Sequence, residues 1–393
     1  MSMPIIKKLH IACVLEDGKL GGPQIYTLRM AVALKEKIDI TIVMPMENSE
    51  NFRKLCDISG VSYKTFWLSR ITKEWKVALR YVLFFPYEIC RLALYFFKEK
   101  FSLVYVCGGS WQYKGAIAGR LSGSKVVWHL NDSSFPFLFR KIFRSLSPLA
   151  SGFIYASIRS KEYYESLIKY NVNEFVIPSP VDTARFDPTN NYTISENLHK
   201  EIGDKIVIGT VANISPVKGL ETMIRSASLL NKDFKNLIFI VIGSISHRQQ
   251  AYFSELKSLC SEFSVDNLLF VGSYTDIRPI LKKIDVYICS SLSESSPISV
   301  WEAMSMGKPI VSTDVGDVNI YVKHNKNGFI VDVGDERAMS KYISVLIKDK
   351  GIKHDFGKIS RNTAVNKLDS KFCALHHIKA FNHVLNYEDD DEL

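Results

Sequence analysis

The sequence predicts an α/β protein with two doubly wound parallel-sheet domains. Short apolar runs rich in β-branched residues alternate with segments of helical pattern along most of the chain. The chain has 393 residues, of which 47% are hydrophobic, and this is enough for two separate cores. Ligands of such sheets lie beyond the C-terminal ends of the strands, so functional residues are expected where the apolar runs end.

The first half of the chain shows this alternation clearly. Strands are expected at residues 10–15, 38–44, 103–107, 125–129, 153–157 and 174–177. Helices are expected at residues 25–35, 112–121 and 160–169. The loop EDGKLGGPQ at 16–24 joins the first strand to the first helix, and its glycines allow the backbone to come close to a bound diphosphate.

The second half repeats the pattern after a polar run at 189–200. A strand is expected at the start of the run 206–219, and further strands at residues 237–243, 268–272, 285–289 and 310–313. Helices are expected at residues 220–230, 298–306 and 370–385. We therefore divide the chain into a first domain at 1–188, a second at 189–369, and a terminal helix with an acidic tail at 370–393.

The stretch SSLSESSPISVWEAMSMGKPIVSTDVG at 290–316 is the most informative. Ser295 and Ser296 are expected to cap a helix whose first residue is Pro297. The helix then continues from Ile298, and its first free amides favour an anion. The glycine and proline of MGKP end it before the next strand.

Two glutamates flank the start of this helix. Glu294 lies in the loop before it, and Glu302 lies eight residues later within it. Carboxylates accept hydrogen bonds from sugar hydroxyls, so the pair suits a ligand with both phosphate and hydroxyls. The alternative is that both glutamates are solvated. Upstream, Lys218 lies in a loop between a strand and a helix, which is again a phosphate-binding arrangement.

The segments GTVANISPVKGLETMIRSASLL, DVYICSS and ESSPISVWEAMSMGKPIVSTDVG, in this order, resemble the C-terminal half of family 4 retaining glycosyltransferases, of the "glycosyl transferases group 1" type. The resemblance implies the GT-B fold, in which two Rossmann-like domains face a cleft and the terminal helix packs on the first domain. It implies a nucleotide-diphosphate sugar as donor, with no cofactor and no metal. Glu294 and Glu302 match the family's E-x7-E pair, and Lys218 matches the lysine of its KG loop.

The resemblance assigns residues to roles. Lys218 stabilises the departing diphosphate, Glu302 holds the ribose hydroxyls and Glu294 the donor sugar. His129, which ends an apolar run, lies near the transferred sugar, although a lone histidine is more often structural. The catalytic residues are therefore expected to be His129, Lys218 and Glu294. The donor-binding residues are expected to be Gly21, Gly22, Asn213, Lys218, Glu294, Ser295, Ser296, Pro297, Ile298 and Glu302.

Acceptor-side residues are expected in the first domain. Gln24 lies where the glycine loop meets the helix, and we expect it to contact the acceptor. Asn131 and Asp132 follow His129 and either shape their loop or face the acceptor. The acceptor is expected to be a glycan or a lipid-linked glycan of bacterial surface polysaccharide.

The sequence departs from the family pattern at two positions. Asn213 stands where the family often has an arginine on the diphosphate, and Ile320 aligns with a usual glutamate. Arg225 or Arg278 is a possible substitute for the missing charge. These departures leave a second interpretation open, a catalytically degenerate GT-B subunit that binds a nucleotide sugar or a partner enzyme.

Charge is concentrated in the first domain, within a net charge of +9. Residues 61–100 carry eight basic and three acidic residues among many aromatic ones, and they are expected to form a helical pair on an anionic membrane surface. A second basic aromatic segment lies at 135–146. Charges and Pro86 interrupt any apolar span long enough to cross a membrane. Core packing is the alternative for these aromatic residues.

Other classes are excluded on composition. No nucleic-acid-binding motif accompanies the basic residues, so nucleic acid is not an expected partner. The seven cysteines are odd in number and show no CxxC spacing, which indicates reduced thiols rather than disulfides or a zinc site. We therefore expect a cytoplasmic protein, peripheral on the inner face of the cell membrane.

Overall fold

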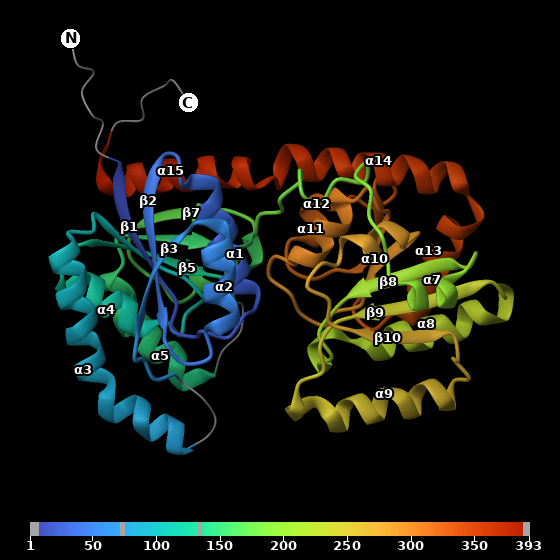
Figure 1. Ribbon diagram of the computed structural model, residues 1–393, viewed down its shortest axis with the longest axis horizontal. Helices are drawn as coiled ribbons and strands as arrows, with labels where there is room; N and C mark the ends of the chain where they lie inside the picture. Colours follow the sequence, from blue (N-terminus) through green and yellow to red (C-terminus); the bar gives the residue numbers. More distant parts are fainter. Residues whose placement is uncertain (1–7, 71–74, 133–135, 388–393) are drawn as a thin grey trace, which may run out of the picture. The chain divides into compact units, whose positions relative to one another are not determined.

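The computed structural model describes residues 8–70, 75–132 and 136–387. It forms two compact units (Figure 1). Unit 1 contains the described residues up to Pro180 and those from Ser370 onward, and unit 2 runs from Val181 to Asp369. Val181 is the first residue of unit 2. Its amide donates to the carbonyl of Leu368, near the end of the same unit, at 2.9 Å. This boundary precedes the one read from the sequence, at 188.

Unit 1 is built on a seven-stranded parallel sheet with the order β3-β2-β1-β4-β5-β6-β7. Its strands are β1 Leu9–Val14, β2 Ile38–Pro45, β3 Ser62–Phe66, β4 Leu103–Val106, β5 Lys125–Leu130, β6 Gly152–Tyr155 and β7 Asn173–Val176. Chain order reverses between β1 and β4. The loops that follow these two strands therefore diverge and leave a crevice, which is the usual ligand position of a doubly wound sheet.

Helices cover both faces of this sheet. One face packs on α1 Gly22–Leu34, α2 Glu50–Ser59 and α15 Ser370–Leu385. The other packs on α3 Trp75–Glu99, α4 Tyr113–Leu121, α5 Phe137–Leu146 and α6 Ile158–Glu165. The terminal helix α15 thus belongs to unit 1, where it lies against α1 (Figure 1).

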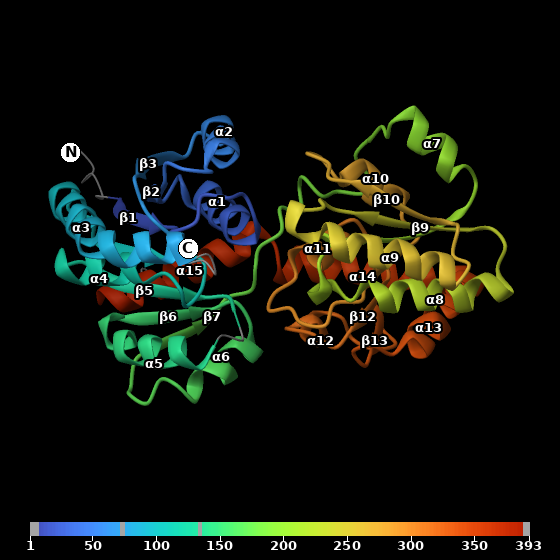
Figure 2. The same cartoon turned by 90° about the horizontal axis from the view of Figure 1, so that it is seen from below.

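Unit 2 contains a six-stranded parallel sheet with the order β10-β9-β8-β11-β12-β13. Its strands are β8 Ile206–Val211, β9 Leu237–Ile242, β10 Leu268–Gly272, β11 Val286–Cys289, β12 Ile310–Thr313 and β13 Gly328–Val331. One face packs on α8 Leu220–Asp233, α9 Gln250–Glu262 and α13 Glu336–Lys348, of which α8 and α9 lie side by side in Figure 2. The other packs on α7 Glu196–Ile202, α10 Arg278–Lys283, α11 Ile298–Ser305, α12 Val318–Tyr321 and α14 Lys350–Lys367. Chain order reverses between β8 and β11.

The helical pair expected at 61–100 is wrong. This segment contains the edge strand β3, paired with β2, and the single helix α3, which carries Pro86 inside it. Proline leaves a backbone carbonyl of the preceding turn unbonded. Because Pro86 lies on the exposed side of α3, water can satisfy that carbonyl and the helix continues. In the described part of the chain, no helix has the length and apolar composition that spanning a bilayer requires.

Candidate functional site

The loops after β8 and β11 meet at the switch point of the unit 2 sheet. The amide of Leu292 donates to the carbonyl of Val217 at 2.8 Å, and the hydroxyl of Ser290 donates to the carbonyl of Lys218 at 3.0 Å. These bonds hold the short 3-10 helix at Pro216–Lys218 against the loop that leads to α11. Residues that are more than seventy positions apart in the sequence thus form one surface at the end of the sheet.

Lys218 and Glu294 form an ion pair on this surface. Lys218 Nζ lies 2.5 Å from Glu294 Oε1, and the hydroxyl of Ser291 donates to the same oxygen at 2.8 Å. The two charged side chains are 25% and 16% exposed, so both can reach a ligand from solvent. The structure therefore brings together two of the three residues expected to be catalytic.

Two glycines allow the loops to approach this closely. Gly219 has φ +55°, and a Cβ there would lie 2.2 Å from the carbonyl oxygen of Ser290. Gly316, at φ +52°, follows β12, and its Cβ would lie 2.1 Å from the carbonyl oxygen of Ser295. Any side chain at either position would separate the loops, because backbone atoms cannot give way cheaply.

The helix after Glu294 begins one residue later than expected. Pro297 is its N-cap, with φ −74° and ψ 97°, and Ile298 is its first residue. The hydroxyl of Ser296 accepts from the indole N–H of Trp301 at 3.1 Å, and the carbonyl of Ser295 accepts from Asp317 N at 3.0 Å. The two serines thus anchor the loop that leads into the helix.

Glu302, Asn213 and Ile320 lie outside the Lys218–Glu294 ion pair, each in different surroundings. Glu302 lies on α11 and is 7% exposed. Asn213 follows β8, and its Oδ1 accepts from the amide and hydroxyl of Ser244, at 3.1 and 2.9 Å. It therefore ties the loop after β8 to the loop after β9. Ile320 lies within α12 and is half-buried.

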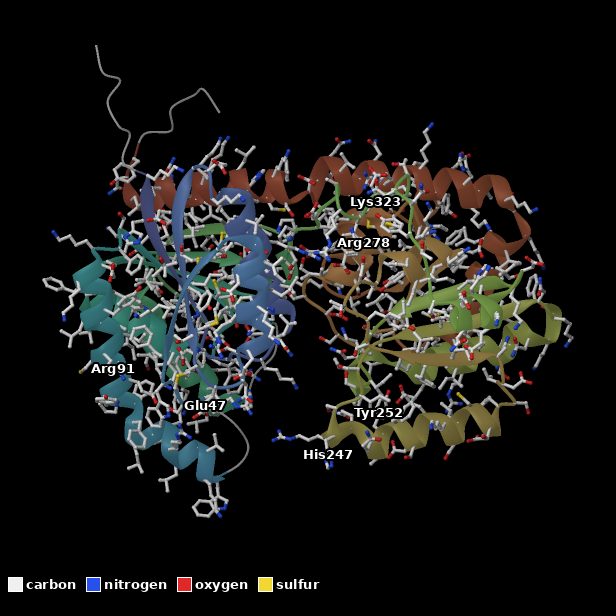
Figure 3. The ribbon with its side chains drawn as sticks, in the orientation of Figure 1. Glu47, Arg91, His247, Tyr252, Arg278 and Lys323 are labelled. Carbon is white, nitrogen blue, oxygen red and sulfur yellow. The ribbon has the colours of Figure 1, made fainter. Side chains whose placement is uncertain are left out.

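The two arginines considered as substitutes are engaged elsewhere. Arg278, labelled in Figure 3, holds Asp276 with Nε at 2.7 Å and Nη2 at 2.5 Å. The guanidinium of Arg225 stacks over the ring of Phe263 at 4.7 Å. Neither supplies the charge that an arginine at position 213 would bring.

A cavity of about 700 Å³ occupies the switch point of unit 1. It is lined by Glu16 after β1, by Gly108 after β4, and by Gly21 and Gln24 at the start of α1. Gly22 is the first residue of α1, and no atom lies within 4 Å of the position its Cβ would take. Gln24 is almost buried, and its amide donates to the carbonyl of Asp17 at 2.7 Å.

His129 is enclosed in the core of unit 1. It is 1% exposed, its ring stacks on Tyr26 with centroids 4.4 Å apart, and neither ring nitrogen has a partner among the described residues. Burial lowers its pKa to about 3, so the imidazole is neutral at physiological pH. His129 does not line the cavity, and its catalytic role stays a prediction.

Asp132 shapes the loop after β4. Its carboxylate accepts from Ser110 Oγ at 2.8 Å and from the hydroxyl of Tyr164. Burial raises the pKa of Asp132, while these hydrogen bonds lower it. Asn131 packs beside Gly109, where a Cβ would lie 2.8 Å from its Oδ1. Neither residue lines the cavity, and contact with an acceptor stays a prediction for both.

The sequence analysis did not predict a buried network of charged residues that involves Glu16, Glu88 and Lys114. Lys114 Nζ lies 2.5 Å from Glu88 Oε2, and both side chains are 0% exposed. Glu16 Oε1 accepts from the amides of Lys114 and Gly115 at 2.7 and 3.2 Å, in the first turn of α4. In the sequence, the indication of this network was Glu16, a charged residue directly after the first expected strand. The other members come from helix interiors.

Glu16 makes stability depend on pH. Burial raises its pKa to about 7 from an ordinary value of 4.5, so the folded protein holds this proton more tightly than the unfolded chain. Its contribution is therefore fully present below pH 4.5 and lost as pH rises to about 7, by about 3 kcal/mol. Glu16→Gln keeps an acceptor for the two amides and removes the titration.

We expect the free energy of unfolding of wild type, relative to Glu16→Gln, to fall between pH 4.5 and 7. Urea denaturation at several pH values measures this difference. The comparison is needed because His129 and His377, whose pKa values burial lowers to about 3 and 4, make stability rise with pH. Parallel curves for the two proteins would show that Glu16 ionises normally.

Comparisons with known proteins agree with this geometry. The sequence model described as "Glycosyl transferases group 1" matches residues 194–363, which include the Lys218–Glu294 site. The chain is 26% identical over 218 residues to the capsular polysaccharide biosynthesis glycosyltransferase CapM of Staphylococcus aureus, covering 55% of this chain and 56% of that protein. It is 22% identical to the N,N'-diacetylbacillosaminyl-diphospho-undecaprenol alpha-1,3-N-acetylgalactosaminyltransferase of Campylobacter jejuni, over 93% of this chain and 97% of that protein.

The fold matches a solved structure over nearly its whole length. Anabaena HepE in complex with UDP and glucose superposes with a TM-score of 0.80 at 19% identity, covering 95% of this chain and 99% of that chain. Two parallel Rossmann-like sheets with a site at the switch point of the second define the GT-B class. Residues 194–363 match the family of glycosyl transferases group 1 that the motifs predicted, and the fold of the chain is that of Anabaena HepE.

Proposed function

We propose that the protein transfers a sugar from a nucleotide-diphosphate donor to a hydroxyl of a lipid-linked glycan during bacterial surface polysaccharide synthesis. The observation that carries this proposal is the Lys218–Glu294 pair at the switch point of the unit 2 sheet. The printed names of the relatives support it, since one acts in capsular polysaccharide biosynthesis and another on a diphospho-undecaprenol acceptor.

The donor binds at the loops after β8 and β11. When the bond between the anomeric carbon and the diphosphate breaks, negative charge develops on the leaving oxygen. Lys218 and the free amides at the start of α11 stabilise that charge, and Glu294 and Glu302 accept from hydroxyls of the sugar and the ribose. Asn213 lies beside the same loop and offers an amide donor in place of an arginine's charge.

The acceptor binds in the unit 1 cavity. Gly21 and Gln24 line it at the start of α1, and a sugar hydroxyl there can bond to exposed backbone amides. The acceptor oxygen forms its new bond on the face that the diphosphate leaves, so the anomeric configuration is retained, and the proton of the acceptor hydroxyl passes to the leaving diphosphate oxygen. No protein carboxylate needs to act as nucleophile in this reaction, and Lys218 supplies the positive charge that a metal ion supplies elsewhere.

Unit 1 also lies on an anionic membrane surface, at the cytoplasmic face of the cell membrane. Apolar side chains recur every three to four residues along the exposed side of α3, namely Trp75, Leu79, Val82, Leu83, Tyr87, Leu94 and Phe97. The α3 helix also carries exposed Arg91, labelled in Figure 3. Helix α5 adds Phe137 and Leu138, both exposed, beside its basic residues. Such a face binds lipid headgroups and acyl chains together.

A binding subunit without transferase activity is the second candidate function. Asn213 and Ile320 favour it, because each replaces a charged residue of the family pattern by an uncharged one. The paired Lys218 and Glu294 oppose it. Release of free nucleoside diphosphate by the purified protein, in excess chelator, separates the two candidates and tests metal independence in the same assay.

A thermal-shift panel of UDP-, GDP- and ADP-sugars tests donor binding. We expect one nucleotide class to stabilise the wild type by about 2.7 kcal/mol at 100 times its dissociation constant. Lys218→Ala and Glu302→Ala should lose the effect, because each removes a donor contact. If no nucleotide sugar raises the midpoint, or if both variants respond like wild type, the proposed donor site is wrong.

A further inference from the structure

A cavity in unit 2 lies at the end of the sheet opposite to the donor loops, and we call it the basal cavity. It has a volume of about 450 Å³ and is lined by Asp285, which precedes β11, and by Pro309, which precedes β12. Because the strands are parallel, their N-terminal ends share one edge of the sheet, whereas Lys218 and Glu294 follow the C-terminal ends of β8 and β11. Even the four residues of β11 separate these two edges by roughly 13 Å. The basal cavity is therefore separate from the donor site.

The side chains that line the basal cavity are mainly basic. Four of them are lysine or arginine and one is histidine, namely Lys308, Lys353, His354, Lys358 and Arg361. Asp285 is the one acidic side chain among the lining residues that the structure describes. The turn between α11 and β12 supplies Lys308, and helix α14 supplies the other four basic residues. Positive charge from two different elements thus converges on one cavity.

Two of these cations have carboxylate partners. Lys353 Nζ lies 2.8 Å from Asp285 Oδ1, and Arg361 Nη2 lies 2.9 Å from Asp187 Oδ2. The other oxygen of Asp285 accepts from the amide of Val207 at 3.0 Å. The carboxylate that lines the cavity is therefore already bound on both oxygens, and it balances the charge of one lysine.

Lys308 and Lys358 are the two lining lysines that form no ion pair with the residues that the structure describes. Lys308 donates to the carbonyl of Lys282 at 2.8 Å, which uses one of its N–H groups but does not neutralise its charge. Burial lowers the pKa of Lys308 to about 8, a shift that Asp285 opposes and Lys353 increases. At neutral pH the ammonium group is therefore charged in a poorly hydrated place, where a bound anion stabilises it.

Two glycines bring the two basic elements together. Gly307, at φ +67°, follows α11, and the amide of Lys308 then donates to the carbonyl of Ala303 at 3.0 Å. A Cβ at Gly357 of α14 would lie 2.3 Å from the carbonyl oxygen of Gly307. The turn that carries Lys308 thus touches the backbone of α14, and helices α11 and α14 pack against each other (Figure 1).

The charge and size of the basal cavity match a phosphate ester. A phosphate monoester carries about −1.5 to −2 charges at pH 7, and two lining lysines lack a countercharge. Ammonium groups are compact charges that bind phosphate oxygens well. A volume of about 450 Å³ leaves room beyond a phosphate ion and is in the range of small-molecule sites. Pro188, Ile284 and Met306 line the cavity with apolar atoms, against which a carbon skeleton can pack.

We propose that the basal cavity binds a small phosphorylated metabolite. Its phosphate lies against Lys308 and Lys358, and its carbon skeleton lies against Pro188 and Met306. This inference goes beyond the proposed function, because it concerns a second anion site that does not depend on the transfer reaction. Free orthophosphate offers similar charge without the carbon skeleton, so the experiment compares the two.

Equilibrium binding of ribose 5-phosphate to the whole protein tests this assignment, at an ionic strength held constant with sodium chloride. We expect saturable binding, and ribose should bind at least about tenfold more weakly because it lacks the phosphate. Orthophosphate should bind more weakly than the ester. Equal affinity for both would overturn the metabolite and assign the cavity to free phosphate. If neither binds, the basal cavity is not an anion site.

Four variants locate the binding. Lys358→Glu should weaken it at least about tenfold, because a carboxylate then faces the phosphate. Lys367→Glu is the matched control, since it makes the same charge change at another exposed position of α14 that does not line the cavity. Lys308→Met should also weaken binding, and Lys358→Glu keeps the test valid if that variant does not fold. Lys218→Ala should bind as wild type does. Equal loss in the Lys358 and Lys367 variants, or loss in Lys218→Ala, would overturn the inference.

Discussion

Replacing Lys218 by alanine is expected to lower kcat about 100- to 1,000-fold, the usual cost of losing one group that stabilises charge in the transition state. In the proposed reaction Lys218 supplies positive charge at the diphosphate, whereas Asn213 is uncharged and Arg225 and Arg278 are engaged elsewhere. The loss should appear in kcat more than in KM, since the charge develops as the bond breaks.

Nucleoside diphosphate release from the donor that stabilises the protein measures this effect. Stability should fall by less than for a fully buried pair, because the side chains of Lys218 and Glu294 keep 25% and 16% exposure, and kcat is therefore compared at a temperature where both proteins are folded. Lys218→Arg is the control that keeps the charge, and it should retain more activity than the alanine variant. A Lys218→Ala enzyme within about fivefold of wild type would show that other groups stabilise the leaving group.

Replacing Lys114 by methionine is expected to destabilise unit 1 by about 3–5 kcal/mol, because it leaves the carboxylate of Glu88 buried without its cation. The ammonium group also donates to Ser69 Oγ at 3.1 Å, and Ser69 donates from its amide and hydroxyl to Glu88 at 2.9 and 3.1 Å. The substitution therefore removes the contacts of Lys114 with both Glu88 and Ser69.

Urea denaturation followed by tryptophan fluorescence measures this loss, with the two units allowed separate transitions. Adding Glu88→Gln to the variant should recover part of the stability, since it removes the unpaired charge. Arg80→Met provides a surface control: its pair with Glu47, at 2.9 Å, is 37% and 52% exposed and should cost less than about 1 kcal/mol. If the Lys114 variant and the surface control lose the same free energy of unfolding, burial does not increase the contribution of the Lys114–Glu88 pair to stability.

The fold class was predictable because most of the strands are short apolar runs that can be recognised from their own sequence. The run at 310–313 and the terminal helix at 370–385 were expected with the bounds that the structure shows. The strand β3 and the unbroken helix α3 were not. An edge strand such as β3 is stabilised by its neighbour β2 rather than by its own sequence pattern, and a proline is compatible with a helix when its unbonded carbonyl meets water.

The sequence by itself determined the two doubly wound sheets, the family match of residues 194–363, and Lys218 and Glu294 as candidate members of one site, which the structure shows to be paired. Only the tertiary structure decided what surrounds each side chain. It stacked the buried ring of His129 on Tyr26 and placed the carboxylate of Glu16 against the amides of the first turn of α4. The reason is physical: periodicity acts over a few residues, whereas burial and pairing depend on contacts such as Glu16 with Lys114, which are 98 positions apart.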